Sequence, residues 1–202
     1  MCSSDLSNGI AEDLYSDGTA SSGKQIGGLQ LLVADDPTTG TVGGISRSAY
    51  ANWRNKKFSC TSDGGSAASS ANIEGYMQTL LLSCTRGKDR PDLITSDNGL
   101  YQKFWGALTD RQRITDSKMA DAGFQNIQFS GIPVVADSDV CPADHMYFLN
   151  TEFIHYRPHK NRNMVPLDSI NSMNQDAMVK FLVWAGNMTL SGARFQGVLF
   201  QT

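Results

Sequence analysis

The spacing of apolar residues in the middle of the chain predicts a helix over residues 73–84. Apolar side chains recur there at intervals of three and four, from Ile73 to Cys84, which places them on one side of a helix. Asn72 and the serines before it are suitable capping residues, and Gly87 is suited to end the helix. We therefore expect this helix to bury one face against a core.

A strand that leads directly into a second helix is expected next. Pro91 introduces a short apolar strand over residues 92–95, and Asp97 or Asn98 can cap the helix that follows. Apolar and aromatic side chains lie on one side of that helix, at Leu100, Tyr101, Phe104, Trp105 and Leu108.

The remaining apolar segments are short and rich in β-branched and aromatic residues, which is typical of strands. Residues 29–34 predict a strand that ends at the turn sequence Asp35-Asp36-Pro37, and residues 45–57 are a helix candidate. Helices in the middle of the chain and strands towards its end indicate an α+β fold. The late strands are expected over residues 127–129, 132–136, 146–149, 153–156, 178–184 and 195–200.

The composition is that of a folded protein without a strongly charged partner. Of 202 residues, 40% are hydrophobic and 18% are charged, so the chain can bury roughly 70% of its unfolded surface. The formal net charge of −3 lacks the basic field of a dedicated nucleic-acid binder. The longest uncharged apolar run, residues 181–185, is far shorter than the ~20 residues that cross a bilayer. Membrane insertion is therefore not expected.

The cysteines indicate a reducing compartment. Cys2, Cys60, Cys84 and Cys141 are far apart in the sequence and form no CxxC pair. A chain of this size does not depend on covalent links for its stability. We therefore expect free thiols that pack as small hydrophobic side chains.

The segment Gly18-Thr19-Ala20-Ser21-Ser22-Gly23-Lys24-Gln25 has the spacing of a phosphate-binding loop up to its last position. Gln25 stands where a magnesium-binding Ser or Thr is required. A working loop also lies between a buried strand and the start of a helix. Here Glu12 and Asp13 precede the segment and Gly27-Gly28 follow it. We expect a surface loop and no nucleotide site.

Cys141 with His145, and His155 with His159, carry side chains that could together bind zinc. Residues four apart on an extended strand lie roughly 13 Å from each other, too far to share one ion without a bend. Pro158 could supply such a bend. Ordinary polar or partly buried histidines are nevertheless the expectation, and no metal ligand is assigned.

Two acidic residues, Asp137 and Asp139, flank Ser138 and could mimic a catalytic acid pair. No local motif places a nucleophile or a base beside them, and neither GxSxG nor HExxH occurs in the chain. A solvated loop is the simpler interpretation. No catalytic or cofactor-binding residue is assigned.

The three tryptophans fall at helix or strand spacing, which favours core packing over a platform for stacking bases. They are Trp53, Trp105 and Trp184. Trp184 lies in the apolar run of residues 181–185, so we expect it to be buried on its sheet.

Two stretches have a more specific pattern. Residues 91–105 place a short strand, a polar cap and an aromatic-bearing helix in succession. Residues 129–137 contain a glycine-hydrophobic-Pro-Val-Val sequence, and residues 141–150 follow with a proline and a hydrophobic strand. Gly131 permits a tight turn, and Pro133 limits pairing on one side, as at a sheet edge.

A third stretch completes the order. Residues 174–200 contain two apolar segments, and Ser191-Gly192 is interpreted as the turn between them. Taken in this order, the three stretches resemble the major capsid proteins of tailed bacteriophages, which have the Hong Kong-type capsid fold. Residues 13–18 and 24–29 also resemble sequences of phage capsid proteins, and with them the resemblance covers about residues 11–202.

The resemblance implies a subunit with an axial and a peripheral domain. Residues 1–59 would be a peripheral-domain-like segment, residues 60–150 axial-domain-like, and residues 151–202 a return to peripheral-domain-like strands. The family's N-terminal arm, extended loop and most of its spine helix would lie upstream of Ile10, so these residues alone would not close a shell. Residues 2–6, Cys-Ser-Ser-Asp-Leu, match what a sequencing adapter encodes, so residues 1–6 are interpreted as non-native and we assign them no function.

The function implied by the resemblance is structural and not enzymatic. Copies of the chain would form pentamers and hexamers of an icosahedral head around double-stranded DNA, in the virion and, during assembly, in the host cytoplasm. The implied partners are other copies of the chain and possible scaffold, portal or decoration proteins, with no cofactor, membrane or specific nucleic-acid site. A tail or other virion structural protein is the alternative, and a nucleotide- or metal-dependent enzyme is a third hypothesis.

Overall fold

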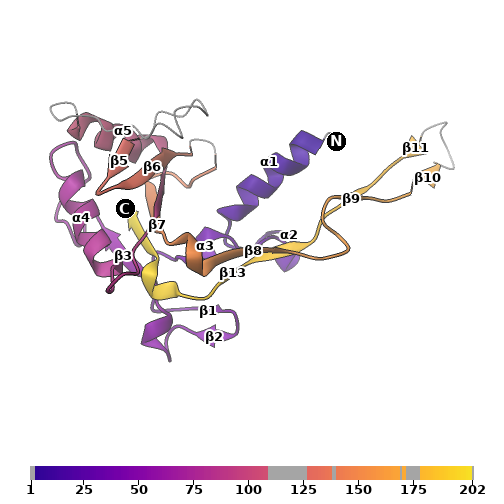
Figure 1. The fold of residues 1–202 in the computed structure, drawn as a ribbon, viewed down its shortest axis with the longest axis horizontal. Coiled ribbons are helices and arrows are strands. Elements are labelled where there is room, and N and C mark those ends of the chain that lie inside the picture. Colours follow the sequence, from indigo (N-terminus) through magenta and orange to yellow (C-terminus); the bar gives the residue numbers. More distant parts are fainter. Residues whose placement is uncertain (1–2, 109–126, 138–139, 169, 172–177, 202) are drawn as a thin grey trace.

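The computed structural model describes residues 3–108, 127–137, 140–168, 170–171 and 178–201. Figure 1 shows a body built around a six-stranded sheet and a long ribbon that extends from the body on the same side as helix α1. The helices are α1 (Ser3–Leu14), α2 (Ala20–Gly23), α3 (Leu29–Leu32), α4 (Ile73–Cys84) and α5 (Asn98–Ala107), with 3-10 turns η1 (Ala51–Trp53), η2 (Thr151–Phe153) and η3 (Ala193–Phe195). The strands are β1 (Thr41–Val42), β2 (Ile45–Ser46), β3 (Lys56–Ser59), β4 (Leu93–Ser96), β5 (Ile127–Phe129), β6 (Ile132–Ala136), β7 (His145–Leu149), β8 (Ile154–Pro158), β9 (Val165–Pro166), β10 (Ile170–Asn171), β11 (Met178–Val179), β12 (Leu182–Val183), β13 (Gly186–Leu190) and β14 (Gly197–Phe200).

The main sheet brings together distant parts of the chain. Its strand order is β3-β14-β7-β4-β6-β5, with β14 parallel to β3 and antiparallel to β7. Residues 60–150 supply four of these strands, and β3 and β14 come from the segments on either side. The sheet with its helices confirms the expected α+β fold.

Alternate residues of the central strands face two separate cores, because successive side chains of a strand point to opposite faces. Phe148 and Leu199 belong to the core on the side of α4 and α5. Tyr147 and Val198 belong to the second core, which contains Tyr15 after the end of α1. Burial of both faces explains why these strands are almost continuously hydrophobic.

Among the described residues, no helix has the length and apolar character needed to cross a bilayer.

Helix α4 forms where the apolar spacing predicts it. It lies so close to β14 that a Cβ atom on Gly197 would be 2.6 Å from Cys84 Sγ and 3.1 Å from Leu80 Cδ1. Only glycine fits this position without movement of the helix. The helix buries the predicted residues Ile73, Met77, Leu80, Leu81 and Cys84.

Strand β4 and helix α5 confirm the predicted strand and helix. Asp97 is the N-cap of α5, and its carboxylate accepts hydrogen bonds from the backbone N–H groups of Leu100 at 2.9 Å and Gly99 at 3.2 Å. The same carboxylate accepts the backbone N–H of Asp144 at 3.0 Å. Asp97 therefore joins the start of α5 to the segment that leads into β7.

The hairpin of β5 and β6 has the turn that its sequence predicts. Ser130 and Gly131 form the two-residue loop, both with positive φ values (52° and 79°), and Gly131 adopts this conformation without steric cost. Pro133 limits pairing on one side, as predicted, because it pairs with β5 and not with β4, although β6 itself lies between these two strands and is not a sheet edge. Pairing with β4 begins one residue later, at Val134, so the missing N–H of Pro133 does not interrupt that ladder.

The strand predicted for residues 29–34 is wrong, because its first four residues form helix α3. Gly28 precedes the helix in an extended conformation. Leu29, Leu32 and Val33 are all buried, at the spacing that one helical turn places on a single side. A short apolar run does not distinguish a buried strand from one buried helical turn.

The helix predicted for residues 45–57 is also wrong, because β2, η1 and β3 occupy this segment. The buried guanidinium of Arg47 donates to the carbonyl oxygens of Leu31 at 2.8 Å and Leu32 at 2.7 Å, at the end of α3. The Asn55 side chain donates to the carbonyl of Ala34 at 2.9 Å. These bonds hold the segment around α3, and its local sequence carries no sign of them.

The ribbon is built from three antiparallel strand pairs, β8 with β13, β9 with β12 and β10 with β11. We call its residues 154–168 and 180–190 the arm. The single strand predicted over residues 178–184 is wrong, because Lys180 and Phe181 separate β11 from β12.

The prediction for the closing strands also needs correction. The last strand begins at Gly197, since residues 193–195 form η3. Ser191-Gly192 does not connect two paired strands, because β13 pairs with β8 in the arm whereas β14 joins the main sheet. The chain passes from arm to body at this point.

Two buried polar side chains close the base of the arm. Gln196 is fully buried before β14; its Oε1 accepts the backbone N–H of Asn150 at 2.8 Å, and its Nε2 donates to the Asn150 carbonyl at 3.1 Å. Asn150 follows β7, and its Nδ2 donates to the carbonyl of Arg90 at 2.9 Å. The arm therefore leaves and re-enters the body between the adjacent strands β7 and β14.

We expect Gln196→Leu to lower the free energy of unfolding by about 2–4 kcal/mol, because it leaves the N–H and C=O groups of Asn150 buried without this partner, at about 1–3 kcal/mol each. Denaturant unfolding measures the change. Gln102→Leu, at an exposed position of α5, makes the same replacement as a control. Equal unfolding midpoints for the two variants would contradict a structural role for Gln196.

Candidate functional site

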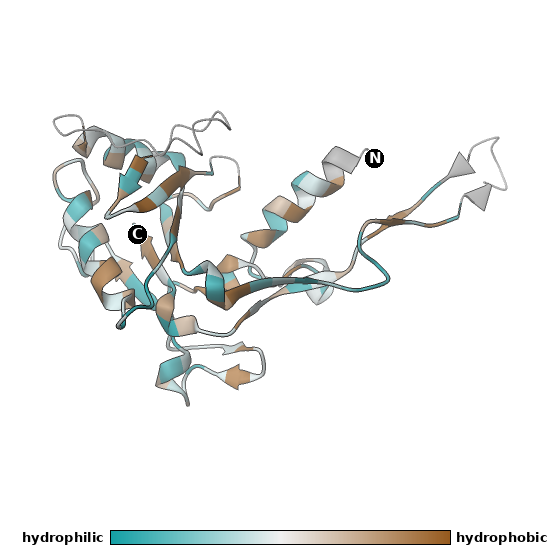
Figure 2. Cartoon of the chain, in the orientation of Figure 1, coloured by the Kyte–Doolittle hydropathy of each residue, from teal (hydrophilic) through white to brown (hydrophobic). Residues whose placement is uncertain are grey.

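The arm is the most exposed part of the described chain. Every residue from 155 to 168 is exposed, although one end of the arm is anchored to the body. Figure 2 shows apolar and polar segments alternating along it. Six of the eight large hydrophobic side chains that are exposed among the described residues lie on the arm: Tyr156, Met164, Val165, Leu167, Phe181 and Leu182.

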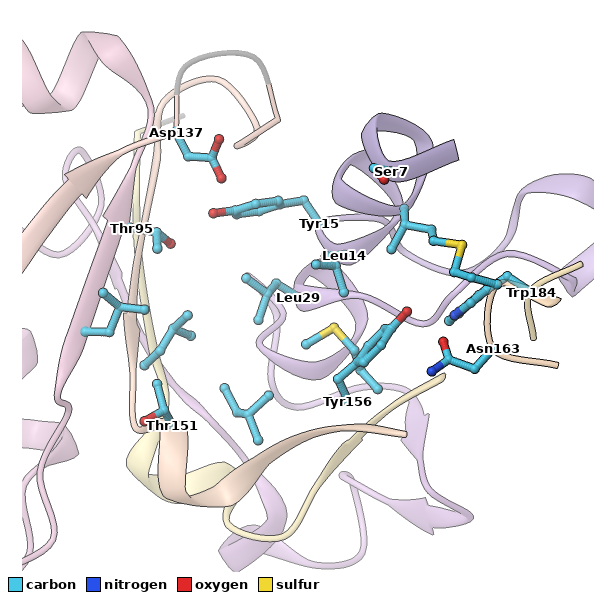
Figure 3. Close-up of a pocket in the computed structure, with 16 residues that line it drawn as sticks. Ser7, Leu14, Tyr15, Leu29, Thr95, Asp137, Thr151, Tyr156, Asn163 and Trp184 are labelled. Carbon is cyan, nitrogen blue, oxygen red and sulfur yellow. The ribbon is translucent and has the colours of Figure 1, made fainter. Parts of the chain in front are cut away.

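A groove runs between α1 and the arm. It consists of two cavities of about 680 and 630 Å³ that share Ile10 and Trp184 as lining residues. Figure 3 shows the larger cavity, with α1 on one side, the arm on another and the main sheet at its inner end. Its lining is mostly apolar, whereas Glu12 and Asp13 lie at the α1 side of the smaller cavity. A groove of this kind suits an elongated apolar occupant.

The inner end of the groove is polar. The Tyr15 hydroxyl points towards Asp137 and Thr95, as Figure 3 shows. Burial raises the pKa of Tyr15 well above its usual range, so the phenol stays protonated at neutral pH and cannot serve as a base. These groups can donate and accept hydrogen bonds but do not form a nucleophile-and-base pair.

Of the four residues considered for zinc, Cys141 and His145 lie close together in the body, whereas His155 and His159 lie on the arm. Cys141 is buried, and its Sγ donates to the carbonyl of His145 at 3.6 Å. Burial, reinforced by the nearby Asp97, raises the pKa of this thiol to about 12, which disfavours its thiolate form. His155 and His159 are exposed on the arm. Within the described residues, no group of three or more candidate ligands comes together.

The segment with phosphate-loop spacing forms an exposed turn at the base of the arm. Ser21 and Ser22 have left-handed backbone angles within the one-turn helix α2. Gln25 donates its Nε2 to Asp13 at 2.7 Å, and the following Gly27 N–H binds Asn187 Oδ1 of the arm at 2.9 Å. The segment contributes contacts between α1 and the arm, and it presents no helix start to a phosphate.

The acid pair cannot be described as such, because Ser138 and Asp139 lie outside the described residues. Asp137 is half-buried beside the polar end of the groove. The structure therefore gives Asp137 a place in the groove lining, which its sequence neighbourhood does not suggest.

The tryptophans are all partly buried. Trp53 donates its Nε1 to the carbonyl of Val42 at 3.2 Å, and Trp105 packs against the first core. The expectation that Trp184 is buried on its sheet is wrong: it lines the groove and stacks on Tyr156 with ring centroids 5.7 Å apart. The apolar run that contains Trp184 lines the groove, because no second layer of the described chain packs on the arm there.

The sequence alone does not identify the arm as a candidate site. Basic residues are concentrated there among apolar ones, at Arg157, Lys160, Arg162 and Lys180. This mixture is compatible with an ordinary surface strand, and only the structure shows that residues 155–168 have no buried face. The one available signal is the local excess of basic residues, four against one acidic residue in residues 154–168 and 180–190.

Comparison with known proteins places the fold. No protein-family model and no curated protein matches the sequence. Among solved structures, the chain is similar to the cyanophage A-1(L) capsid asymmetric unit, with a TM-score of 0.70 and 20% identity over 97% of this chain and 65% of that chain. It is also similar to the holo-SrpI encapsulin complex of Synechococcus elongatus PCC 7942, with a TM-score of 0.51 and 15% identity over 72% of this chain and 52% of that chain.

These similarities confirm the expected fold. Both neighbours have the Hong Kong-type capsid fold, and this chain has it as well. The chain spans 65% of the length of the cyanophage chain and 52% of the encapsulin chain.

A single ion pair joins α3 to the start of β7. His145 Nε2 lies 3.0 Å from Asp35 Oδ2, and His145 Nδ1 lies 2.6 Å from the carbonyl oxygen of Ala143. Both ring nitrogens thus face acceptors, and only the doubly protonated ring donates to both. Burial lowers the pKa of His145, but the bonds to Asp35 and Ala143 outweigh it, so the pKa is raised overall.

We expect Asp35→Ala to destabilise the protein in acid and to have little effect in alkali. A raised pKa in the folded state adds stability that is complete below the ordinary value of about 6.5 and is lost as the pH rises through the raised value. The effect should stay below about 1 kcal/mol, because the Asp35 side chain is 48% exposed. Unfolding midpoints between about pH 5.5 and pH 8.5 test this, with His155→Asn on the arm as control. A difference that grows towards high pH would refute the assignment.

Proposed function

We propose that this chain is a subunit of the icosahedral head of a tailed bacteriophage. Copies associate into pentamers and hexamers that enclose double-stranded DNA, in the virion and, during assembly, in the host cytoplasm. The subunit acts by noncovalent assembly and catalyses no reaction. Its principal partner is a second copy of itself, and scaffold, portal or decoration proteins are further partners.

The observation that carries this proposal is the similarity to a cyanophage capsid subunit over 97% of the chain. The similarity extends through the sheet, both cores and the arm, because so little of the chain is left out of it. The encapsulin similarity supports shell formation more generally, since encapsulins share the fold. Self-association is therefore the function that the architecture supports best.

The surface of the chain supports the same conclusion. An exposed arm with six large hydrophobic side chains is costly for a monomer in water, because patches of this kind are rare on monomeric proteins. The net charge of −3 suits a shell that encloses DNA better than a protein that binds DNA directly. No cluster of catalytic groups among the described residues competes with this interpretation.

We extend the proposal to the division of the subunit. Residues 60–150, which include α4, α5 and four strands of the main sheet, form the axial domain. Residues 1–59 and 151–202, which include α1 and the arm, form the peripheral domain. In this arrangement the hydrogen bonds between Asn150 and Gln196 lie at the junction of the two domains.

Sedimentation velocity and negative-stain electron microscopy of the purified chain test the proposal. We expect oligomers whose class averages have five-fold or six-fold symmetry, because the heterologous contacts of such rings close when the interface angle fits. Helical tubes without such rings would favour the alternative, a tail protein. A chain that stays monomeric at the highest attainable concentration would contradict both.

A further inference from the structure

We infer that the larger cavity of the groove binds a small amphipathic cation, a primary ammonium group on an unbranched apolar chain. The ammonium group binds to Tyr15, Thr95 and Asp137 at the inner end, and the apolar chain lies along the rest of the cavity. This inference goes beyond the proposed function and does not depend on it, because one copy of the chain supplies the whole site.

Three separate parts of the fold bring the polar side chains of the site together. Tyr15 follows α1, Thr95 lies in β4, and Asp137 follows β6. Strand β6 pairs in parallel with β4, and the Asp137 N–H donates to the carbonyl of Ser96 at 2.9 Å. Figure 3 shows the Tyr15 hydroxyl pointing towards both of the other side chains. The three polar groups therefore converge at the inner end of the cavity.

Thr95 is a polar residue on an otherwise apolar face of β4. Alternate residues of a strand share a face, so Thr95 lies beside Leu93, and both line the cavity. Thr95 is only 9% exposed, and its Oγ1 has no hydrogen-bond partner among the described residues. A buried hydroxyl without a partner is unfavourable, because it has given up its hydrogen bonds to water. A ligand that hydrogen-bonds to this hydroxyl removes that penalty.

The polar end of the cavity favours a positively charged ligand. Among the described residues that line it, Asp137 supplies the one carboxyl group, and none is a lysine, arginine or histidine. Burial raises the pKa of Tyr15 well above its usual range, so this hydroxyl stays neutral. A primary ammonium has three N–H donors, which match one carboxylate and two hydroxyl acceptors. A ligand carboxylate would instead be repelled by Asp137.

The remainder of the cavity favours an apolar chain. Its volume of about 680 Å³ lies within the range of roughly 300–1,000 Å³ that is usual for small-molecule sites. Ile10 and Leu14 of α1, Leu93 of β4 and Met188 of β13 contribute apolar walls. This volume holds a chain longer than the four-carbon stem of a lysine side chain. We therefore assign the site to a free small molecule and not to a lysine of a partner protein.

Isothermal titration calorimetry of the full chain with octylamine, which is protonated at neutral pH, tests the inference. Octanol and octanoate have a chain of the same length with a neutral or negative head, and butylamine has the same head with a shorter chain. We expect one octylammonium to bind per chain, octanol and butylammonium to bind about tenfold or more weakly, and octanoate not to bind. Sedimentation velocity checks that the ligands leave the association state unchanged.

Three conservative substitutions remove the polar groups one at a time. We expect Asp137→Asn, Thr95→Val and Tyr15→Phe each to weaken octylammonium binding by about fivefold or more, because each removes one acceptor. Thr95→Val keeps the shape of the side chain, so the fold should survive, and circular dichroism checks each variant. Asp89→Asn, after α4 and outside the groove lining, is the control and should bind like the wild type.

Tryptophan fluorescence locates the bound ligand. Trp184 lines the cavity, whereas Trp105 packs against the first core and Trp53 lies beside β1 and β2. We expect octylammonium to change the emission of the wild type. Trp184→Phe should abolish this change while retaining binding in the calorimeter.

Four outcomes would overturn the inference. They are the absence of saturable octylammonium binding, octanoate binding as tight as that of octylammonium, butylammonium binding as tight as that of octylammonium, and binding by the three site variants that equals the control. The third outcome would indicate a site for a lysine side chain. None of the four bears on the proposed function, which is tested separately by the association of copies.

Discussion

The close packing of α4 on β14 is the constraint on which the rest of the structure depends. Strand β14 pairs with β3 on one side and β7 on the other, so it joins the beginning, middle and end of the chain. Its side chains supply both cores, with Leu199 on one face and Val198 on the other. Gly197 lets α4 approach this strand, because a Cβ atom there would overlap Cys84 Sγ. The position of the arm follows from that of β14, which receives its returning end.

Local signals account for what the sequence predicts correctly. Helix α4 has an apolar repeat of its own, and α5 has Asp97 as a cap within its first turn, so neighbouring residues contain the information. The hairpin of β5 and β6 is specified by Gly131 in the same way. The resemblance to capsid proteins, which rests on the order of such local elements, predicts the overall fold correctly.

The incorrect predictions concern segments that are shaped by distant contacts. The extended path around Arg47 depends on carbonyl groups of α3, which the local pattern of residues 45–57 does not reveal. Trp184 belongs to an apolar run that would suit a buried strand, but it lies on a ribbon with no covering layer. For the same reason, the sequence suggests individual zinc and phosphate ligands but not the groove, whose lining comes from α1, the main sheet and the arm. The arm and the groove can be recognised only from the three-dimensional arrangement of their residues.

The hydrogen bonds between Gln196 and Asn150 have a consequence for how the ribbon can vary in length. These bonds hold the two ends of the ribbon side by side. The stability of the body therefore depends on closure of the loop there and only weakly on the length of the loop. Loop-closure entropy rises slowly, by about 0.6 kcal/mol for each doubling of length. Insertions or deletions in the ribbon are therefore expected to leave the folding of the body nearly unchanged while altering how far the ribbon extends from it.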